Sequence, residues 1–124
     1  SESLVMETEH LLNMPPSGLL AALAQETAKQ AEDFMAECKA TLSEFYKSGP
    51  GAPGTNLDQG VIQVEEYQTK LVTNKKRGKE LMNAEGLFNL PITVYPELVH
   101  IEQELVQLEF ELQKKYINYL QKLI

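Results

Sequence analysis

Two breaks divide this chain into long helix-compatible stretches, and the second break constrains the fold most. In residues 84–98 (AEGLFNLPITVYPEL), Leu90 precedes Pro91 and Tyr95 precedes Pro96. A proline disfavours the α conformation in the residue before it, whereas Pro96 itself suits the first turn of a new helix. We therefore expect one helix to end near residue 88 and another to begin at Pro96.

The segment between these two helices is apolar. Its apolar side chains and prolines are Leu87, Phe88, Leu90, Pro91, Ile92, Val94, Tyr95 and Pro96. Several of them alternate, as in an extended segment, in which every second side chain points to the same face. Connectors usually run over the surface and are polar. The pattern therefore predicts a structural joint at residues 89–95 whose apolar face is covered.

Helical periodicity accounts for most of the rest of the chain. Met35, Cys38, Leu42 and Phe45 form one apolar stripe in residues 17–48. The loop 49–56, rich in glycine and proline, ends at Asn56, a favourable N-cap with Gln59 in the capping-box position, which predicts a helix over 57–88. Residues 96–124 carry a heptad seam of seven positions: Leu98, Ile101, Leu105, Leu108, Leu112, Tyr119 and Leu123.

These stretches define the expected fold class. Helices of roughly 30 residues are about 45 Å long and bury their apolar stripes only by lying side by side. The sequence therefore predicts an all-α protein, an elongated antiparallel three-helix bundle over residues 17–124, preceded by a short helix or irregular segment over 1–16. The chain begins at Ser1, and the helical pattern still runs at Ile124, so we expect a piece of a larger protein.

Charge and composition narrow the classes of partner. The formal net charge of -7 disfavours binding to nucleic acid or to anionic membranes. No apolar run reaches the ~18 residues that a membrane helix needs. The single cysteine, Cys38, lies in an apolar stripe, which favours a buried, reduced thiol and a cytosolic compartment.

The sequence offers no catalytic, cofactor-binding or metal-binding residues. Gly49 and Gly54 have the spacing that opens a phosphate-binding loop, but Thr55 stands where the lysine is required, and Pro50 and Pro53 remove amides from the loop. The only two histidines, His10 and His100, have no partner at the short spacing typical of a metal site. We therefore expect this chain not to be an enzyme.

The only concentration of basic side chains is formed by Lys75, Lys76, Arg77 and Lys79. Two interpretations stay open: a docking site for an acidic partner surface, or an exposed helical turn. Gly78 lies within this run and weakens the helix by about 1 kcal/mol relative to alanine, so both a straight helix and a bend are open there.

The joint also carries a family resemblance. Residues 83–98 (NAEGLFNLPITVYPEL) resemble a signature of dynein heavy chains at the junction where the tail enters the linker. Residues 45–54 (FYKSGPGAPG) and 57–60 (LDQG) are similar to the matching tail segment of axonemal members. The resemblance covers roughly residues 34–108, and it departs at Gly86, where the family usually has a basic residue.

The resemblance implies a non-catalytic, mechanical part of a microtubule-based motor of cilia and flagella. ATP and magnesium would be bound by AAA+ modules elsewhere in the heavy chain. The implied partners are the remainder of the heavy chain and its intermediate or light chains, with microtubules reached only through the parent motor. The implied location is the cytoskeleton, in the ciliary or flagellar axoneme. The alternative is a free-standing helical adaptor or coiled-coil module that self-associates through the final heptads.

This interpretation makes the two connectors unequal. We expect the loop 49–54 to vary freely in shape, so that replacing Ala52 has little effect. We expect the joint to be pinned by its apolar face, so that an aspartate in place of either Ile92 or Tyr95 loosens it.

Overall fold

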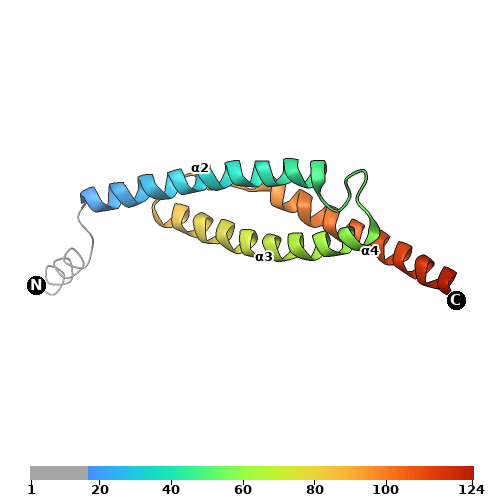
Figure 1. Cartoon of the computed structure of the whole chain (residues 1–124). Helices are drawn as coiled ribbons and strands as arrows, with labels where there is room; N and C mark the ends of the chain where they lie inside the picture. The colour runs from blue at the N-terminus through green and yellow to red at the C-terminus, as the bar shows by residue number, and fades with distance from the viewer. Residues whose placement is uncertain (1–16) are drawn as a thin grey trace, which may run out of the picture.

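The computed structural model of the protein describes residues 17–124, which form α2 (Ser17–Ser48), α3 (Leu57–Leu87) and α4 (Pro96–Leu123). Each helix runs antiparallel to the one before it, and the last turns of α4 extend beyond the other two helices (Figure 1). The predicted all-α, elongated antiparallel three-helix bundle is confirmed. The segment 1–16, for which we expected a short helix or irregular structure, lies outside the described residues.

The helix ends follow from local sequence. The Asn56 side chain accepts a hydrogen bond from the backbone N–H of Gln59 at 2.8 Å, so Asn56 is the N-cap of α3, as predicted. Pro96 occupies the first turn of α4, where its missing N–H leaves no partner unpaired. At the end of α2, the Gln63 amide donates to the carbonyl of Ser48 at 3.1 Å, which satisfies one of the free carbonyls of that helix.

The core consists of two clusters along the bundle axis. The joint cluster contains Phe34, Cys38, Leu81, Tyr95 and Leu98. The loop cluster, toward the 49–56 connector, contains Phe45, Val64, Ile101 and Leu105. Leu71 packs against both clusters. All three helices contribute to each cluster, so neither cluster forms unless the helices lie side by side.

The predicted seam of α4 is buried only in its first half. Leu98, Ile101 and Leu105 are buried, and Leu108 and Leu112 are half-buried. Tyr119 and Leu123 are exposed, contrary to a seam that continues to the end of the helix. The reason is geometric, because α4 extends past the ends of α2 and α3, so neither of these two helices lies against its last turns (Figure 1).

The 49–56 loop is packed, which corrects the expectation that it varies freely. Gly49, Pro50 and Ala52 are buried. Thr55 donates its hydroxyl to the carbonyl of Gly49 at 3.2 Å, and a Cβ added at Gly51 would lie 3.0 Å from a methyl of Leu108. The loop therefore covers the end of the core between α2 and α4.

Candidate functional site

The joint begins with an ordered end to α3. The N–H of Leu90 donates to the carbonyl of Glu85 at 2.8 Å, and the N–H of Asn89 donates to the carbonyl of Gly86 at 3.3 Å. Asn89 has a positive φ of 55°, a conformation that asparagine adopts more readily than most residues. This pair of bonds is the Schellman motif, which satisfies the last carbonyls of the helix and turns the chain sharply.

A buried carboxylate then ties the joint back to α3. Glu85 is 2% exposed, and its side chain accepts two hydrogen bonds from Thr93, one from the backbone N–H at 3.0 Å and one from the hydroxyl at 2.6 Å. A buried charge is tolerated when it is hydrogen-bonded in this way. Because the bonds join two residues eight positions apart, they fix residue 93 against the last turn of the helix.

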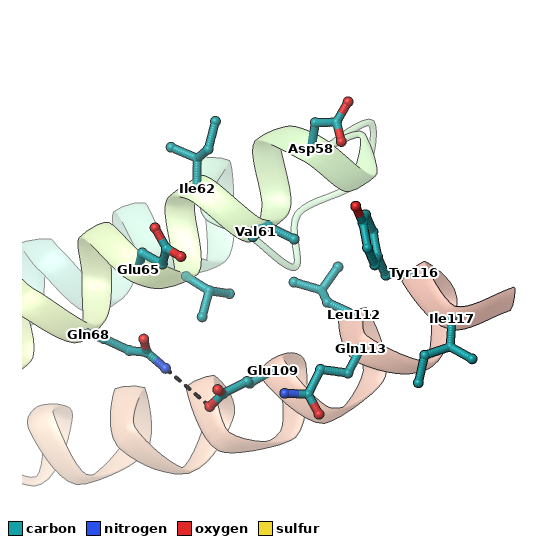
Figure 2. Close-up of a pocket in the computed structure, with 11 residues that line it drawn as sticks. Asp58, Val61, Ile62, Glu65, Gln68, Glu109, Leu112, Gln113, Tyr116 and Ile117 are labelled. Carbon is teal, nitrogen blue, oxygen red and sulfur yellow. Dashed lines mark hydrogen bonds between the residues drawn. The ribbon is translucent and has the colours of Figure 1, made fainter. Parts of the chain in front are cut away.

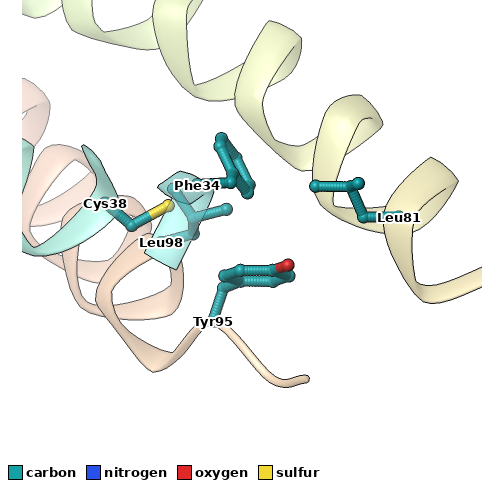
Figure 3. Packing of buried hydrophobic residues seen from close by; sticks show 5 residues of the cluster. All are labelled: Phe34, Cys38, Leu81, Tyr95 and Leu98. Atoms are coloured by element: carbon teal, nitrogen blue, oxygen red, sulfur yellow. The ribbon is translucent and has the colours of Figure 1, made fainter. Parts of the chain in front are cut away.

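Tyr95 anchors the other end of the joint. Its side chain is 8% exposed and meets the ring of Phe34 edge to face, with the ring centroids 4.9 Å apart (Figure 3). Gly78 of α3 lies against both rings, and a Cβ added there would be 3.2 Å from Tyr95. Gly78 is thus part of a close contact inside one continuous helix.

The apolar face of the joint points outward, which corrects the expectation that it is covered. Ile92 is 50% exposed and Val94 65% exposed, and Leu87 is also exposed. Phe88 and Leu90 are half-buried, while Pro91 and Pro96 are exposed. In an extended segment, neighbouring side chains point to opposite faces, so the inward placement of Thr93 and Tyr95 turns Ile92 and Val94 outward.

The surroundings of the joint cluster keep its ionisable groups neutral. The pKa of Cys38 is raised to about 11, chiefly by burial and then by the carboxylates of Glu97 and Glu37, while Arg77 acts in the opposite direction. Burial also raises the pKa of Tyr95, and the nearby carboxylate of Glu85 acts in the same direction. Both groups are therefore protonated at neutral pH, and Cys38 is a packed, weakly nucleophilic thiol.

Two side chains of the basic cluster, which lies on α3, form ion pairs with the neighbouring helices. Lys75 forms an ion pair with Glu102 of α4 at 2.8 Å, and Arg77 forms one with Glu37 of α2 at 3.0 Å. Arg77 also lies 4.8 Å from the centre of the Phe34 ring. Lys76 and Lys79 are exposed. Two of the four cations therefore pair with carboxylates on neighbouring helices, where such half-exposed pairs contribute about 0 to 1 kcal/mol each.

An open groove lies at the opposite end of the bundle, between the start of α3 and the second half of α4 (Figure 2). It has a volume of about 630 Å³, with apolar side chains that include Ile62, Leu112 and Ile117. The amide of Gln68 donates to the carboxylate of Glu109 at 3.2 Å across one end of it. The side chains that line the groove include no serine, cysteine, histidine or lysine.

Within residues 17–124, no three His, Cys, Asp or Glu side chains gather closely enough to hold a metal ion. Across the same part of the chain, none of the helices combines the length and the apolar character that crossing a bilayer requires.

Three residues that define the joint were not predicted from the sequence: Phe34, Glu85 and Gly78. Phe34 precedes the apolar stripe recognised in α2, and Glu85 is a charged residue in a signature dominated by apolar ones. Gly78 follows Leu71 by seven positions and precedes Leu81 by three, so it occupies the inward stripe of α3. A glycine at such a position indicates the close approach of another side chain, so the sequence alone could have predicted a close contact at Gly78.

Three relatives match the chain. Dynein axonemal heavy chain 10 of Homo sapiens is 38% identical over 79 residues, which are 64% of this chain and 2% of that protein. The Dynein-1-alpha heavy chain, flagellar inner arm I1 complex, of Chlamydomonas reinhardtii is 33% identical over 85 residues, 68% of this chain and 2% of that protein. The chain is homologous to a short segment of axonemal dynein heavy chains. The resemblance to dynein heavy chains is therefore confirmed at the level of the family.

A more distant relative agrees with this assignment. The Dynein gamma chain, flagellar outer arm, of Chlamydomonas reinhardtii is 24% identical over 91 residues, 73% of this chain. The chain spans about 2% of the length of each of these dynein heavy chains. No protein-family model matches it, and no solved structure matches it.

Proposed function

We propose that this chain is the non-catalytic junction between the tail and the linker of an axonemal dynein heavy chain, and that it transmits force mechanically. The sequence signature over residues 83–98 supports the position in the heavy chain. The observation that carries the mechanical role is the double attachment of the joint, through Glu85 to Thr93 and through Tyr95 to Phe34.

Force transmission through this segment depends on how far the joint can yield. A connector that is free to rotate absorbs displacement before it transmits force. Here the chain turns at Asn89, is bonded to α3 at Thr93 and enters the core at Tyr95, so the direction of α4 relative to α3 is set at three points within seven residues. Close packing of the core resists changes in that angle.

The remaining parts of the proposal rest on the resemblance to dynein heavy chains. ATP hydrolysis, with its ATP and magnesium, belongs to parts of the heavy chain outside this segment. The partners are the remainder of the heavy chain and its intermediate or light chains, and the location is the ciliary or flagellar axoneme. Microtubules are reached only through the parent motor.

The test uses the full-length heavy chain that carries this segment. Tyr95→Ala removes the aromatic contact with Phe34, and we expect slower microtubule gliding at an unchanged rate of ATP hydrolysis. The matched control is Ile92→Ala, an apolar truncation in the same joint at a half-exposed position, which should leave gliding unchanged. Unchanged gliding in Tyr95→Ala, or an equal loss in both variants, contradicts the mechanical role.

A further inference from the structure

A second heptad seam runs along the outer side of α4. Starting at Val99, residues recur at spacings of 4, 3, 4, 3, 4, 3 and 4 up to Ile124, which is the a and d pattern of a coiled coil. Six of these positions are apolar and exposed: Val99, Val106, Phe110, Ile117, Leu120 and Ile124. The remaining two are Gln103 and Gln113, which are also exposed.

This outer seam is distinct from the buried seam of the same helix. Leu98, Ile101 and Leu105 face α2 and α3, whereas Val99 and Val106 each follow a buried leucine by one residue and so lie about 100° further around the helix. Val106 is 66% exposed and Phe110 59% exposed. The bundle therefore uses one side of α4 and leaves an apolar stripe of about 38 Å on the other.

We infer that this outer seam pairs in parallel and in register with the same seam of a second copy of the chain. The two glutamines of the seam, Gln103 and Gln113, favour this parallel, in-register pairing. In register, Gln103 faces its own copy and Gln113 faces its own copy, so each buried amide finds both a donor and an acceptor. A partner helix with only apolar a and d residues leaves both amides without hydrogen bonds, which is costly in a buried interface.

Charge complementarity supplies the second argument and the orientation. In the heptad register of the outer seam, Glu109 occupies a g position and Lys114 the following e position, the two positions that face each other between parallel helices. Lys114 already lies 4.6 Å from the centre of the Phe110 ring, at the edge of the seam. Glu109 uses one carboxylate oxygen to accept from Gln68, and its other oxygen is available to the partner's lysine.

The antiparallel alternative is less favourable. Aligning Gln103 with Gln113 of an antiparallel copy centres the pair on residue 108 and brings Glu109 against Glu109 of the second copy, where like charges repel. It also leaves Leu120 and Ile124 beyond the paired region. The parallel pair uses all eight positions of the seam.

Sedimentation equilibrium of the 124-residue chain tests the inference, over about 1 to 200 µM at about 0.15 M salt. We expect a monomer–dimer equilibrium that Phe110→Glu weakens by at least about 100-fold, because each partner then presents a charge to the apolar seam. The matched control is Val72→Glu, which makes the same kind of change at an exposed position of α3 and should leave the dimer intact. A monomer at every concentration overturns the inference, as does a dimer that Phe110→Glu leaves unchanged.

Two further variants test the orientation. Lys114→Glu should weaken the dimer about tenfold, and adding Glu109→Lys to it should restore the affinity, because the exchange recreates the pair. In a Cys38→Ser background, Gln113→Cys should form an intermolecular disulfide under mild oxidation, since only parallel in-register pairing brings residue 113 against its own copy. A dimer that does not cross-link, or that the charge exchange fails to restore, overturns the parallel arrangement.

Circular dichroism tests whether the variants are folded. Phe110 and Lys114 lie on the exposed side of α4, so their variants should melt at the temperature of the parent chain when measured at a concentration where both are monomers. The inference does not depend on the proposed mechanical role, because it concerns a face of α4 that the joint does not use.

Discussion

In both connectors of this bundle, the residues that are buried differ from those that the composition of the connector would indicate. The 49–56 loop is made of glycine, proline and small polar residues, yet Pro50 and Ala52 are buried against the core. The 89–95 joint is rich in apolar residues, yet Ile92 and Val94 are half-exposed or more, and the side chains that attach it are Thr93 and Tyr95. The composition of a connector thus indicates little about which of its residues carry the packing.

Space and hydrogen bonding explain the contrast. The loop closes the end of the core where α2, α3 and α4 come together, and only small residues fit beside Leu108 there. The joint crosses the opposite end, where the large ring of Tyr95 fills the space left by Gly78. Once Tyr95 faces inward and Thr93 is bonded to Glu85, alternation along the extended chain decides the rest.

The largest expected effect separates two residues of the joint. Tyr95→Asp removes a buried aromatic ring and buries a charge, which should lower the free energy of unfolding by about 4 kcal/mol or more. Ile92→Asp, at a half-exposed position, should lower it by no more than about 1 kcal/mol. Urea denaturation followed by circular dichroism measures both values. Equal losses would mean that the joint is held by its outer face after all.

The loop should respond next. Ala52→Asp places a charge at a buried position and should lower the free energy of unfolding by about 2 kcal/mol. The neighbouring Pro53 is exposed, so Pro53→Asp should cost about 1 kcal/mol or less. The same urea experiment compares them. If the two variants are equally stable, the loop is as free to vary as its composition indicates, and the contrast between the connectors disappears.

A smaller effect should come from the bond between Thr93 and Glu85. Thr93→Val keeps the shape of the side chain but removes the hydroxyl donor, which should cost about 1.5 kcal/mol. A double-mutant cycle with Glu85→Gln should give a coupling energy of about 1 kcal/mol. Thr69→Val is the control, because the exposed Thr69 hydroxyl donates only to a carbonyl of its own helix. Additive effects of the two joint variants would show that this bond does not hold the joint.

The smallest effect concerns the reactivity of Cys38 as a reporter of the joint cluster. With its pKa raised to about 11, the thiol is almost wholly protonated at pH 8, so labelling by a thiol reagent should be slow and should accelerate as the pH approaches 11. Because the folded pKa lies above the ordinary 9.0, the stability linked to this thiol is present below pH 9 and is lost as the pH rises from 9 to 11.

The same reagent compares the two connectors. Tyr95→Asp should speed the labelling of Cys38 more than Ala52→Asp does, since Tyr95 belongs to the cluster that covers the thiol and Ala52 does not. The chain unfolded in urea gives the upper limit of the rate. Equal rates in the two variants would indicate that the clusters open together.

Local sequence determined the helices of this protein and the places where they end. Three features act over only a few residues: the capping side chain of Asn56, the fixed backbone of Pro96 and the apolar period of each helix. They can therefore be recognised in the sequence without knowledge of the fold. The similarity of the signature to dynein heavy chains is likewise a property of the sequence.

Only the tertiary structure decided which faces are covered. An alternating segment has two faces, and the choice between them depends on Phe34 and Gly78, which lie far away along the chain. The two apolar stripes of α4 pose the same problem, because both have helical spacing and the bundle has room to cover only one. Burial depends on contacts between distant segments, and periodicity alone does not specify them.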